Sequence, residues 1–454
     1  MNRRRGSILI LVMVIVFAIA FMVLALGKQV RTSALAANND AAAAKADAAE
    51  RGAEQYVLSL LADYRDTLTD LTETDFSAVQ VGNAYFWIVR PDYGDSTFNT
   101  WGLVDESGKL PLNTVTQEQL LGLAGVTDEI SGAIIDWRDA DDSVSTNGAE
   151  SSTYSQFGYG AKNSDFETVD ELMLVNGMTH DILYGPPTGQ ASDQATAASA
   201  SGSSDWYLTH GLYDYFTAWS STPNTAADGT ARVSLIDTST RDALRELFRD
   251  KLGNSRGNEI VARLGRNAPE VKSILEFAGA TGMTAEDIAA VEDYVTIDST
   301  VTTLKGKVNI NTAPRDVLIA MGVMAETDVD ALLAARPAGM AQYPNSMAWV
   351  YDAFKSKTNV LASMGDLFCA RGRQYSADIV AASSDGRGFR HVRVVIDTTS
   401  TPPRIVYRRD LTENGWPLDP QIRANLKSGA GVYGTTTTSG TSGAANQSAG
   451  TGAR

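Results

Sequence analysis

The feature that most constrains this chain is a run of nineteen apolar residues, Ile8–Leu26, near its first residue. As a helix, such a run rises about 28 Å, which matches the hydrocarbon core of a bilayer at about 30 Å. No charged residue and no proline interrupts it. The sequence therefore predicts one membrane-spanning helix that holds the rest of the chain to a bilayer.

Three arginines, Arg3–Arg5, stand directly before this run. Because positive residues stay on the cytoplasmic side, they predict a cytoplasmic N-terminus and a body on the outer side. A cleaved secretory signal is the alternative, but its apolar region is shorter, about 7–15 residues, and ends at a small-residue cleavage site. Leu35–Ala37 is only a weak site of that kind, so the anchor is favoured.

Composition excludes several classes of function. The net charge of −16 argues against a partner bound through its phosphates. A single cysteine, Cys369, rules out an internal disulfide, and the three histidines lack the spacing of zinc ligands. The sequence also lacks the common nucleophile, phosphate-loop and metalloprotease motifs. We therefore expect a protein that is not an enzyme.

The ends of the chain predict a helix packed on a sheet. From Lys28 to about Asp70 there is no proline, and apolar residues from Ala53 to Tyr64 recur at helical spacing. The membrane helix should therefore continue into water. β-Branched runs near residues 85–91, 377–383, 391–396 and 404–408 predict neighbouring antiparallel strands drawn from both ends of the chain.

The intervening segment of about 250 residues contains an internal repeat. Leu110–Leu121 parallels Val308–Leu318, and Val233–Leu244 is a looser third copy. In each copy an extended piece precedes a helix, as in small helix–hairpin–helix units. The residues expected to cap or begin these helices are Asn113, Asn311, Asp237 and Pro314.

Helix–hairpin–helix units often bind DNA, usually through a Gly-x-Gly turn with basic residues nearby. The corresponding turns here, Ala124–Asp128 and Met321–Ala325, lack the second glycine, and an acidic residue ends or follows each of them. With the acidic overall charge, this favours structural modules and no nucleic-acid partner.

Several of these features together resemble the K-type minor pseudopilins of type II secretion systems, which are type IV pilin-like proteins. The resemblance rests on the basic leader ending in glycine, the membrane helix, and four body segments: Gly102–Glu106, Ile135–Asp142, Asp165–Met178 and Asn311–Pro314. It implies cleavage between Gly6 and Ser7 and methylation of Ser7. Most pilin-like proteins carry glutamate where this chain has Leu11, whereas K-type members lack it, as expected for a subunit at the filament tip.

The resemblance also implies a location and partners. The protein would span the inner membrane once, with its body in the periplasm, and support protein export. Its partners would be the prepilin peptidase, the I- and J-type minor pseudopilins, membrane lipid, and exoproteins or the outer-membrane secretin. A minor pilin of a type IV pilus and a singly anchored periplasmic binding protein are the alternatives.

An acidic segment is the candidate metal site. Asp139, Asp141, Asp142 and Glu150 supply oxygen ligands of the kind that calcium prefers. Three carboxylates within four residues repel one another unless a cation or an arginine offsets their charge. From the residues alone a solvated acidic loop is the preferred alternative; the resemblance, whose family is associated with calcium, implies the cation as an equal alternative. Weaker candidates are Asp105, Glu106, Asp136 and Glu171.

The predicted fold is α+β, with a long N-terminal helix on an antiparallel pilin-like sheet and a large insertion of SAM-like or helix–hairpin–helix units. The predicted boundaries are a leader at 1–6, a membrane helix at 7–27, its periplasmic continuation at 28–75, a sheet from 76–100 and 376–412, helical units at 101–185, 231–300 and 301–375, a linker at 186–230, and a disordered tail at 428–454.

Overall fold

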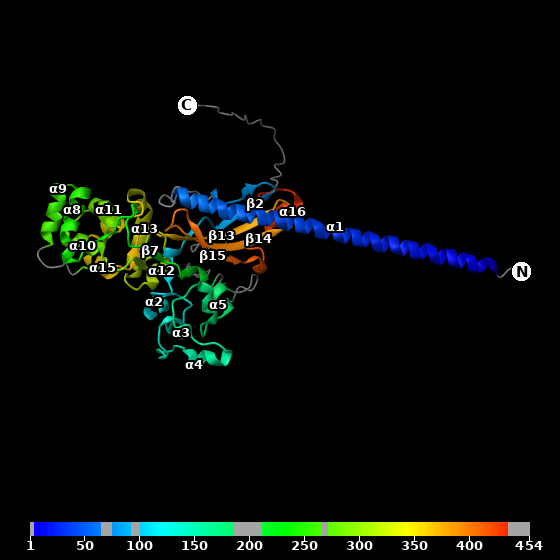
Figure 1. Ribbon diagram of the computed structural model, residues 1–454, viewed down its shortest axis with the longest axis horizontal. Coiled ribbons are helices and arrows are strands. Elements are labelled where there is room, and N and C mark those ends of the chain that lie inside the picture. Colours follow the sequence, from blue (N-terminus) through cyan, green and yellow to red (C-terminus); the bar gives the residue numbers. More distant parts are fainter. Residues whose placement is uncertain (1–3, 65–74, 92–99, 186–210, 265–270, 435–454) are drawn as a thin grey trace, which may run out of the picture.

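The computed structural model describes residues 4–64, 75–91, 100–185, 211–264 and 271–434. Its longest element is α1 (Arg4–Tyr64), a single helix of 61 residues. Figure 1 shows this helix in blue, projecting far from the body toward the N-terminus. Its side chains from Ile10 to Ala41 are exposed. By length and composition, it is a helix able to cross a membrane.

The second half of α1 turns one face to the body. Alanines 42, 46, 49 and 53, then Val57 and Leu61, are buried at intervals of three or four residues. This face of α1 packs against three strands of a sheet, β2 (Ala84–Arg90), β13 (Gln374–Ser383) and β14 (Phe389–Asp397). The small alanines allow close approach, and a Cβ added at Gly388 would lie 2.4 Å from the backbone of Ala42.

Within the described residues, this sheet has seven strands, which come from both ends of the chain. Its main order is β1-β2-β13-β14-β15, with every neighbouring pair antiparallel. Two short strands, β3 and β4, add to β2 and β13. The strands are β1 (Val79–Val81), β2 (Ala84–Arg90), β3 (Thr100–Trp101), β4 (Val104–Asp105), β13 (Gln374–Ser383), β14 (Phe389–Asp397) and β15 (Arg404–Asp410). The prediction of a long helix on an antiparallel sheet is confirmed.

Both faces of the sheet are covered, because successive strand residues point to opposite sides. On β2, Phe86 and Ile88 join the core under α1, whereas Trp87 and Val89 face the other way. There they meet residues from the end of the chain, including Leu426 of α16 (Pro420–Ser428) and Val432. The predicted disordered tail at 428–454 therefore begins too early in the chain, because its first residues form the end of α16 and pack in this second core. Residues 435–454 lie outside the described residues.

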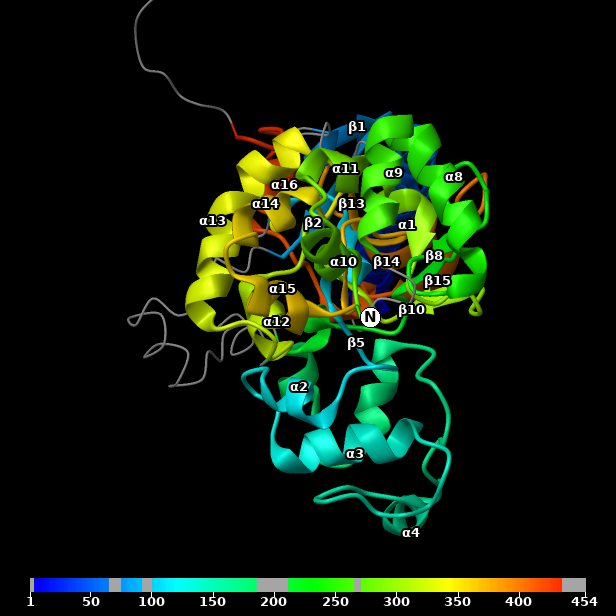
Figure 2. The ribbon, with the colours of Figure 1, turned by 90° about the vertical axis from the view of Figure 1, so that its left-hand side faces the viewer.

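The insertion forms three helical units beside the sheet (Figures 1 and 2). We call them the first unit (101–217), the middle unit (231–297) and the last unit (301–375). Figure 2 shows the first unit, in cyan, hanging below the other two. Their helices are α2 (Gln117–Leu121), α3 (Asp128–Arg138), α4 (Ser151–Tyr154) and α5 (His180–Tyr184); α8 (Arg241–Leu252), α9 (Asn254–Arg263), α10 (Ile274–Thr281) and α11 (Ala285–Val291); and α12 (Arg315–Ala320), α13 (Glu326–Gln342), α14 (Ala348–Phe354) and α15 (Thr358–Met364).

Each unit is closed by two short parallel strands, one at each of its ends. β5 (Leu110–Pro111) pairs with β6 (Phe216–Thr217), β8 (Val233–Ser234) with β9 (Val295–Thr296), and β11 (Val308–Asn309) with β12 (Phe368–Cys369). The same backbone hydrogen bond of 2.9 Å follows each pair, donated by the amide of Leu112, Leu235 or Ile310. The three copies recognised in the sequence are thus three copies of one closed unit.

These closures correct the predicted linker at 186–230. Residues 211–217 return to the first unit, where Leu212, Tyr213, Tyr215 and Phe216 are buried in its core. Farther on, β7 (Ser221–Pro223) pairs with β10 (Thr303–Lys305) of the last unit. The polar composition of this stretch concealed an aromatic closing segment. Residues 186–210 lie outside the described residues.

Candidate metal centre and the helical units

The first unit brings three carboxylates together. One oxygen from each of Asp136, Asp139 and Glu150 lies within 4.8 Å of the others. Asp136 and Asp139 come from the end of α3 and its C-cap, one helical turn apart, and Glu150 is the N-cap residue of α4. The loop 139–150 therefore folds back over the helix that it leaves.

Close packing holds the loop in this position. The backbone N–H of Ser145 donates to the Asp136 carboxylate at 3.1 Å. A Cβ added at Gly148 would lie 2.0 Å from Oδ2 of the same carboxylate, so only glycine fits there. Similarly, a Cβ on Gly132 of α3 would lie 2.8 Å from the backbone of the loop. Two glycines thus allow loop and helix to touch.

Glu150 is the most informative member of the cluster. Its side chain is buried, and neither carboxylate oxygen has a hydrogen-bond partner in the described part of the chain. Burial, and then the nearby Asp136 and Asp139, raise the pKa of Glu150 to about 7. Burial also raises the pKa of Asp139. A buried carboxylate without partners is costly unless a proton or a cation compensates it.

The cluster fits a hard divalent cation on these grounds. Calcium binds six to eight oxygens from carboxylates, carbonyls and water. Asp136, Asp139 and Glu150 would supply carboxylate oxygens, and Glu150 places one of its two unpartnered oxygens in the cluster.

The predicted metal residues are only partly brought together. Asp139 and Glu150 join the cluster, but Asp141 and Asp142 lie outside it and are exposed. Asp141 accepts from the backbone N–H of Ser143 at 2.7 Å, and Asp142 accepts from Asn163 at 3.2 Å. These hydrogen bonds engage the carboxylates of Asp141 and Asp142 with partners outside the cluster. Asp136, ranked lower in the sequence, takes the central place because α3 turns it toward the loop.

The other weaker candidates have structural partners. Asp105 accepts hydrogen bonds from Asn309 and Thr312 and so joins the edge of the sheet to the last unit. Glu106 pairs with Lys109 at 2.6 Å. Glu171 pairs with Lys162 at 2.7 Å and caps its own short helix through the backbone of Thr168.

Two asparagines at matching positions of the repeat, Asn113 and Asn311, do not cap their helices as predicted. Asn113 exchanges hydrogen bonds of 2.7 and 2.9 Å with the backbone of Phe166, 53 residues away. Asn311 donates to the carbonyl of Ala370 at 2.8 Å and accepts from the Trp349 indole at 2.9 Å. Both side chains tie the first turn of a unit to a distant loop. Asp237 does cap its turn, through Ser239, and Pro314 precedes α12 as its N-cap residue.

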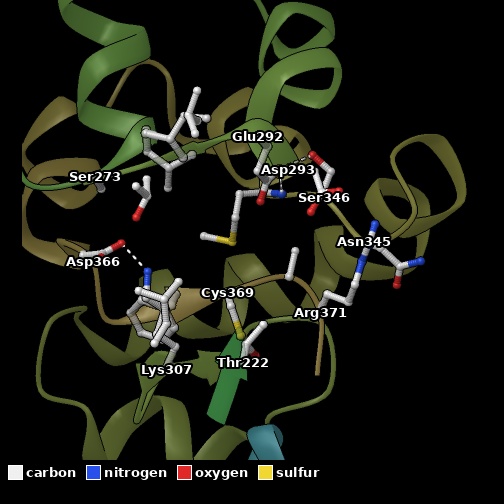
Figure 3. Close-up of a pocket in the computed structure, with 18 of the residues that line it drawn as sticks. Thr222, Ser273, Glu292, Asp293, Lys307, Asn345, Ser346, Asp366, Cys369 and Arg371 are labelled. Atoms are coloured by element: carbon white, nitrogen blue, oxygen red, sulfur yellow. Dashed lines mark hydrogen bonds and ion pairs between the residues drawn. The ribbon is translucent and has the colours of Figure 1, made fainter. Parts of the chain in front are cut away.

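Apart from the carboxylate cluster, a pocket with a volume of about 310 Å³ lies between the middle and last units (Figure 3). Charged residues that line it are paired within their own units: Arg232 with Asp293 in the middle unit, and Lys307 with Asp366 in the last unit. Glu292 of the middle unit accepts from the Ser346 hydroxyl and the backbone of Met347. Cys369 also lines the pocket, and burial raises its pKa to about 12. We therefore interpret this pocket as part of the polar contact between the two units, which Glu292 makes with Ser346 and Met347.

The residues implied in processing lie at the start of α1. Gly6 and Ser7 belong to this helix, and their side chains are outside the described residues. Leu11 is exposed, with 60% of its surface accessible.

One segment of the chain matches a known protein family. Residues 96–184, most of the first unit, match the family model of type II secretion system (T2SS), protein K. The resemblance inferred from the sequence is confirmed for this segment. No curated protein matches the chain. Among solved structures, a chain of the GspK-GspI-GspJ complex from the enterotoxigenic Escherichia coli type 2 secretion system aligns over 84% of this chain and 99% of its own, with 11% identity and a TM-score of 0.40.

Proposed function

We propose that this chain, whose residues 96–184 match protein K of type II secretion systems, is a minor pseudopilin of such a system. The match is the observation that carries the proposal. Its architectural support is that the matched unit is joined to a sheet packed on a long helix with an apolar, exposed first half. Its role is structural, in supporting protein export across the outer membrane.

In this proposal the apolar half of α1 has two successive roles. It first holds the precursor in the inner membrane, with Arg3–Arg5 in the cytoplasm and the body in the periplasm. After the prepilin peptidase cuts behind Gly6 and Ser7 is methylated, the same surface packs against the membrane helices of other subunits. The exposure of all side chains from Ile10 to Leu26 supports both roles.

The shape of the body supports a place at the filament tip. The three units stand beside the sheet and extend well beyond the width of α1 (Figures 1 and 2). A subunit stacked above them would have no room for a helix in line with α1. Leu11 in place of the usual glutamate agrees with this, because a tip subunit has no neighbour above to pair with. The I- and J-type minor pseudopilins would be its partners below.

We further propose that calcium binds Asp136, Asp139 and Glu150. The cation would neutralise carboxylates that otherwise repel one another and would hold the loop 139–150 on α3. Its role here is to stabilise the first unit.

A pair of glycine variants tests the proposal. Gly6→Val should block cleavage, so that the uncut precursor accumulates in the membrane and export of secreted proteins falls. Gly27→Val is the matched control: Gly27 lies in the same helix, nothing lies within 4 Å of a Cβ built there, and cleavage and export should continue. Unchanged processing and export in Gly6→Val would contradict the proposal. Co-purification with pilus subunits instead of I- and J-type pseudopilins would favour a type IV pilus.

A further inference from the structure

An exposed apolar patch lies on the first unit. It is formed by Phe157, Tyr159, Met173 and Leu174, whose exposed fractions are 62, 38, 36 and 45%. The rings of Phe157 and Tyr159 stack with centroids 6.2 Å apart, and the Tyr159 hydroxyl donates to the carbonyl of Leu174 at 3.0 Å. These contacts join Phe157, Tyr159 and Leu174, and together with Met173, the neighbour of Leu174 in the chain, we call them the aromatic patch.

The aromatic patch is held from beneath by buried rings. Trp137 and Tyr154 are almost fully buried and meet edge to face at 5.1 Å. Tyr154 stacks on Tyr159 at 5.4 Å, and Tyr159 stacks on Phe157. The Tyr154 hydroxyl accepts from the backbone of Asn176 at 3.1 Å. The exposed rings are therefore fixed in position, which lowers the entropy lost when a partner binds.

The unit that carries the aromatic patch is strongly acidic. Residues 101–185 contain 15 Asp and Glu against 3 Lys and Arg, so 3 minus 15 gives −12 of the chain's net charge of −16. Glu129 is exposed, and it accepts a hydrogen bond of 2.8 Å from Asn176, two residues after Leu174. Such a surface repels nucleic acid and anionic lipid, and attracts cationic groups. Exposed aromatic faces also bind guanidinium and ammonium groups.

We propose that the aromatic patch is a docking surface for a partner segment that combines arginine or lysine with aliphatic or aromatic side chains. The apolar residues of that segment cover Phe157 and Leu174, and its cations lie among the surrounding carboxylates. Charge sets the approach and selects the partner, while the buried apolar contact provides most of the affinity. The surface belongs to the first unit alone and does not depend on the assignment to a secretion system.

Designed peptides test this on the full chain in nanodiscs of neutral phosphatidylcholine. Three labelled twelve-residue peptides serve as probes, with arginine alternating with leucine, arginine alternating with serine, or glutamate alternating with leucine. Fluorescence anisotropy should show binding of the arginine–leucine peptide and much weaker binding of the other two. If the arginine–serine peptide binds equally well, charge alone explains the binding. If the glutamate–leucine peptide binds equally well, apolar contact alone explains it. Either result overturns the proposal.

Variants locate the binding. The double variant Phe157→Ser/Leu174→Ser should weaken binding of the arginine–leucine peptide by about tenfold or more. Leu121→Ser is the matched control, since Leu121 is 40% exposed in α2 of the same unit but outside the aromatic patch; its affinity should stay within about twofold of wild type. Peptide bound to the nanodisc itself is equal in all samples and cancels. Equal affinity of the double variant and the wild type overturns the proposal.

Discussion

The first and last units are two copies of one design with opposite electrostatic character. Each begins with a short strand, an Asn-Thr pair and a helix, and each is closed by a parallel strand. An arginine at equivalent places, Arg138 and Arg336, donates to carbonyls of the first turn. Yet residues 101–185 carry −12, whereas residues 301–375, with 8 basic and 6 acidic residues, carry 8 minus 6, or +2.

The two copies also contact each other. α2 packs on α12, and a Cβ added at Gly122 would lie 2.8 Å from Cα of Ala320. Gln119 donates to the carbonyl of Met321. The difference in charge therefore does not come from the shared packing, which both copies need. Four of the fifteen acidic residues of 101–185 lie in the loop 139–150, and the others are spread over the rest of the unit.

The largest expected difference between the copies is their response to calcium. Added calcium should stabilise the first unit by about 2.7 kcal/mol when free calcium is a hundred times the dissociation constant. Hydrogen exchange should slow in α3 and the loop 139–150 and stay unchanged in α13. Glu150→Gln should abolish the effect, whereas Asp141→Asn, outside the cluster, should leave most of it. Equal protection of both units would break the distinction.

A second prediction concerns how the unfolding free energy depends on pH through Asp105, at the contact between the first and last units. Burial raises the pKa of Asp105 to about 6, and its carboxylate accepts from Asn309 and Thr312 of the last unit. Because the folded pKa lies above the unfolded value, this group stabilises the fold most below about pH 4 and loses that contribution as pH rises through 6.

The size of that loss is on the order of 3 kcal/mol, from a shift of about two pKa units. Asp105→Asn should remove it, so that the unfolding free energy from pH 4 to 7 becomes flatter than in wild type. Asp165→Asn, at an exposed carboxylate paired with Lys305, is the control and should leave the slope unchanged. An identical pH profile for Asp105→Asn and wild type would show that Asp105 does not titrate in this range.

The buried tryptophans give a third, smaller contrast. In the last unit the Trp349 indole donates to Asn311, so Trp349→Phe leaves a buried acceptor without its donor and should cost about 1–3 kcal/mol. In the first unit the Trp137 indole N–H has no partner in the described part of the chain. Trp137→Phe should therefore cost about 1 kcal/mol less than Trp349→Phe. Chemical denaturation measures both, and the reverse order would contradict this account of the two cores.

The smallest expected difference lies at the first helix of each copy. Thr116 caps α2 in a reciprocal capping box with Gln119, whereas α12 follows Pro314 without a side-chain cap. Thr116→Ala should cost about 1 kcal/mol, and Pro314→Ala about half of that or less. Thermal unfolding of the two variants would show the order, and equal losses would remove the distinction between the caps.

The parts of the fold that the sequence predicts are those with long, regular patterns. The stripe from Ala53 to Leu61 and the β-branched runs near both chain ends predict a helix on a sheet, because each repeats a period over many residues. The unit closures are two residues long and carry no period, so β6 and β12 could not be recognised. The cluster Leu212, Tyr213, Tyr215 and Phe216 was a usable signal that the neighbouring polar linker concealed.

The candidate metal site was predicted in part for a similar reason. Asp139, Asp141 and Asp142 lie within four residues of one another in the sequence, and this proximity led to their selection. Proximity in the fold depends instead on helical phase, which pairs Asp136 with Asp139, and on the path of a twelve-residue loop, which brings in Glu150. The roles of Asn113 and Asn311 were likewise out of reach, because their partners are distant in sequence.

The central claim is that this chain is an assembled pseudopilin, and the mass of its N-terminus tests that most directly. Protein extracted from membranes, digested and analysed by mass spectrometry should begin at Ser7 and carry one methyl group on its terminal nitrogen. An N-terminus that still starts at Met1 would indicate a permanently anchored periplasmic protein. One that starts just after Ala37 would indicate a cleaved secretory signal, and either result would contradict the account.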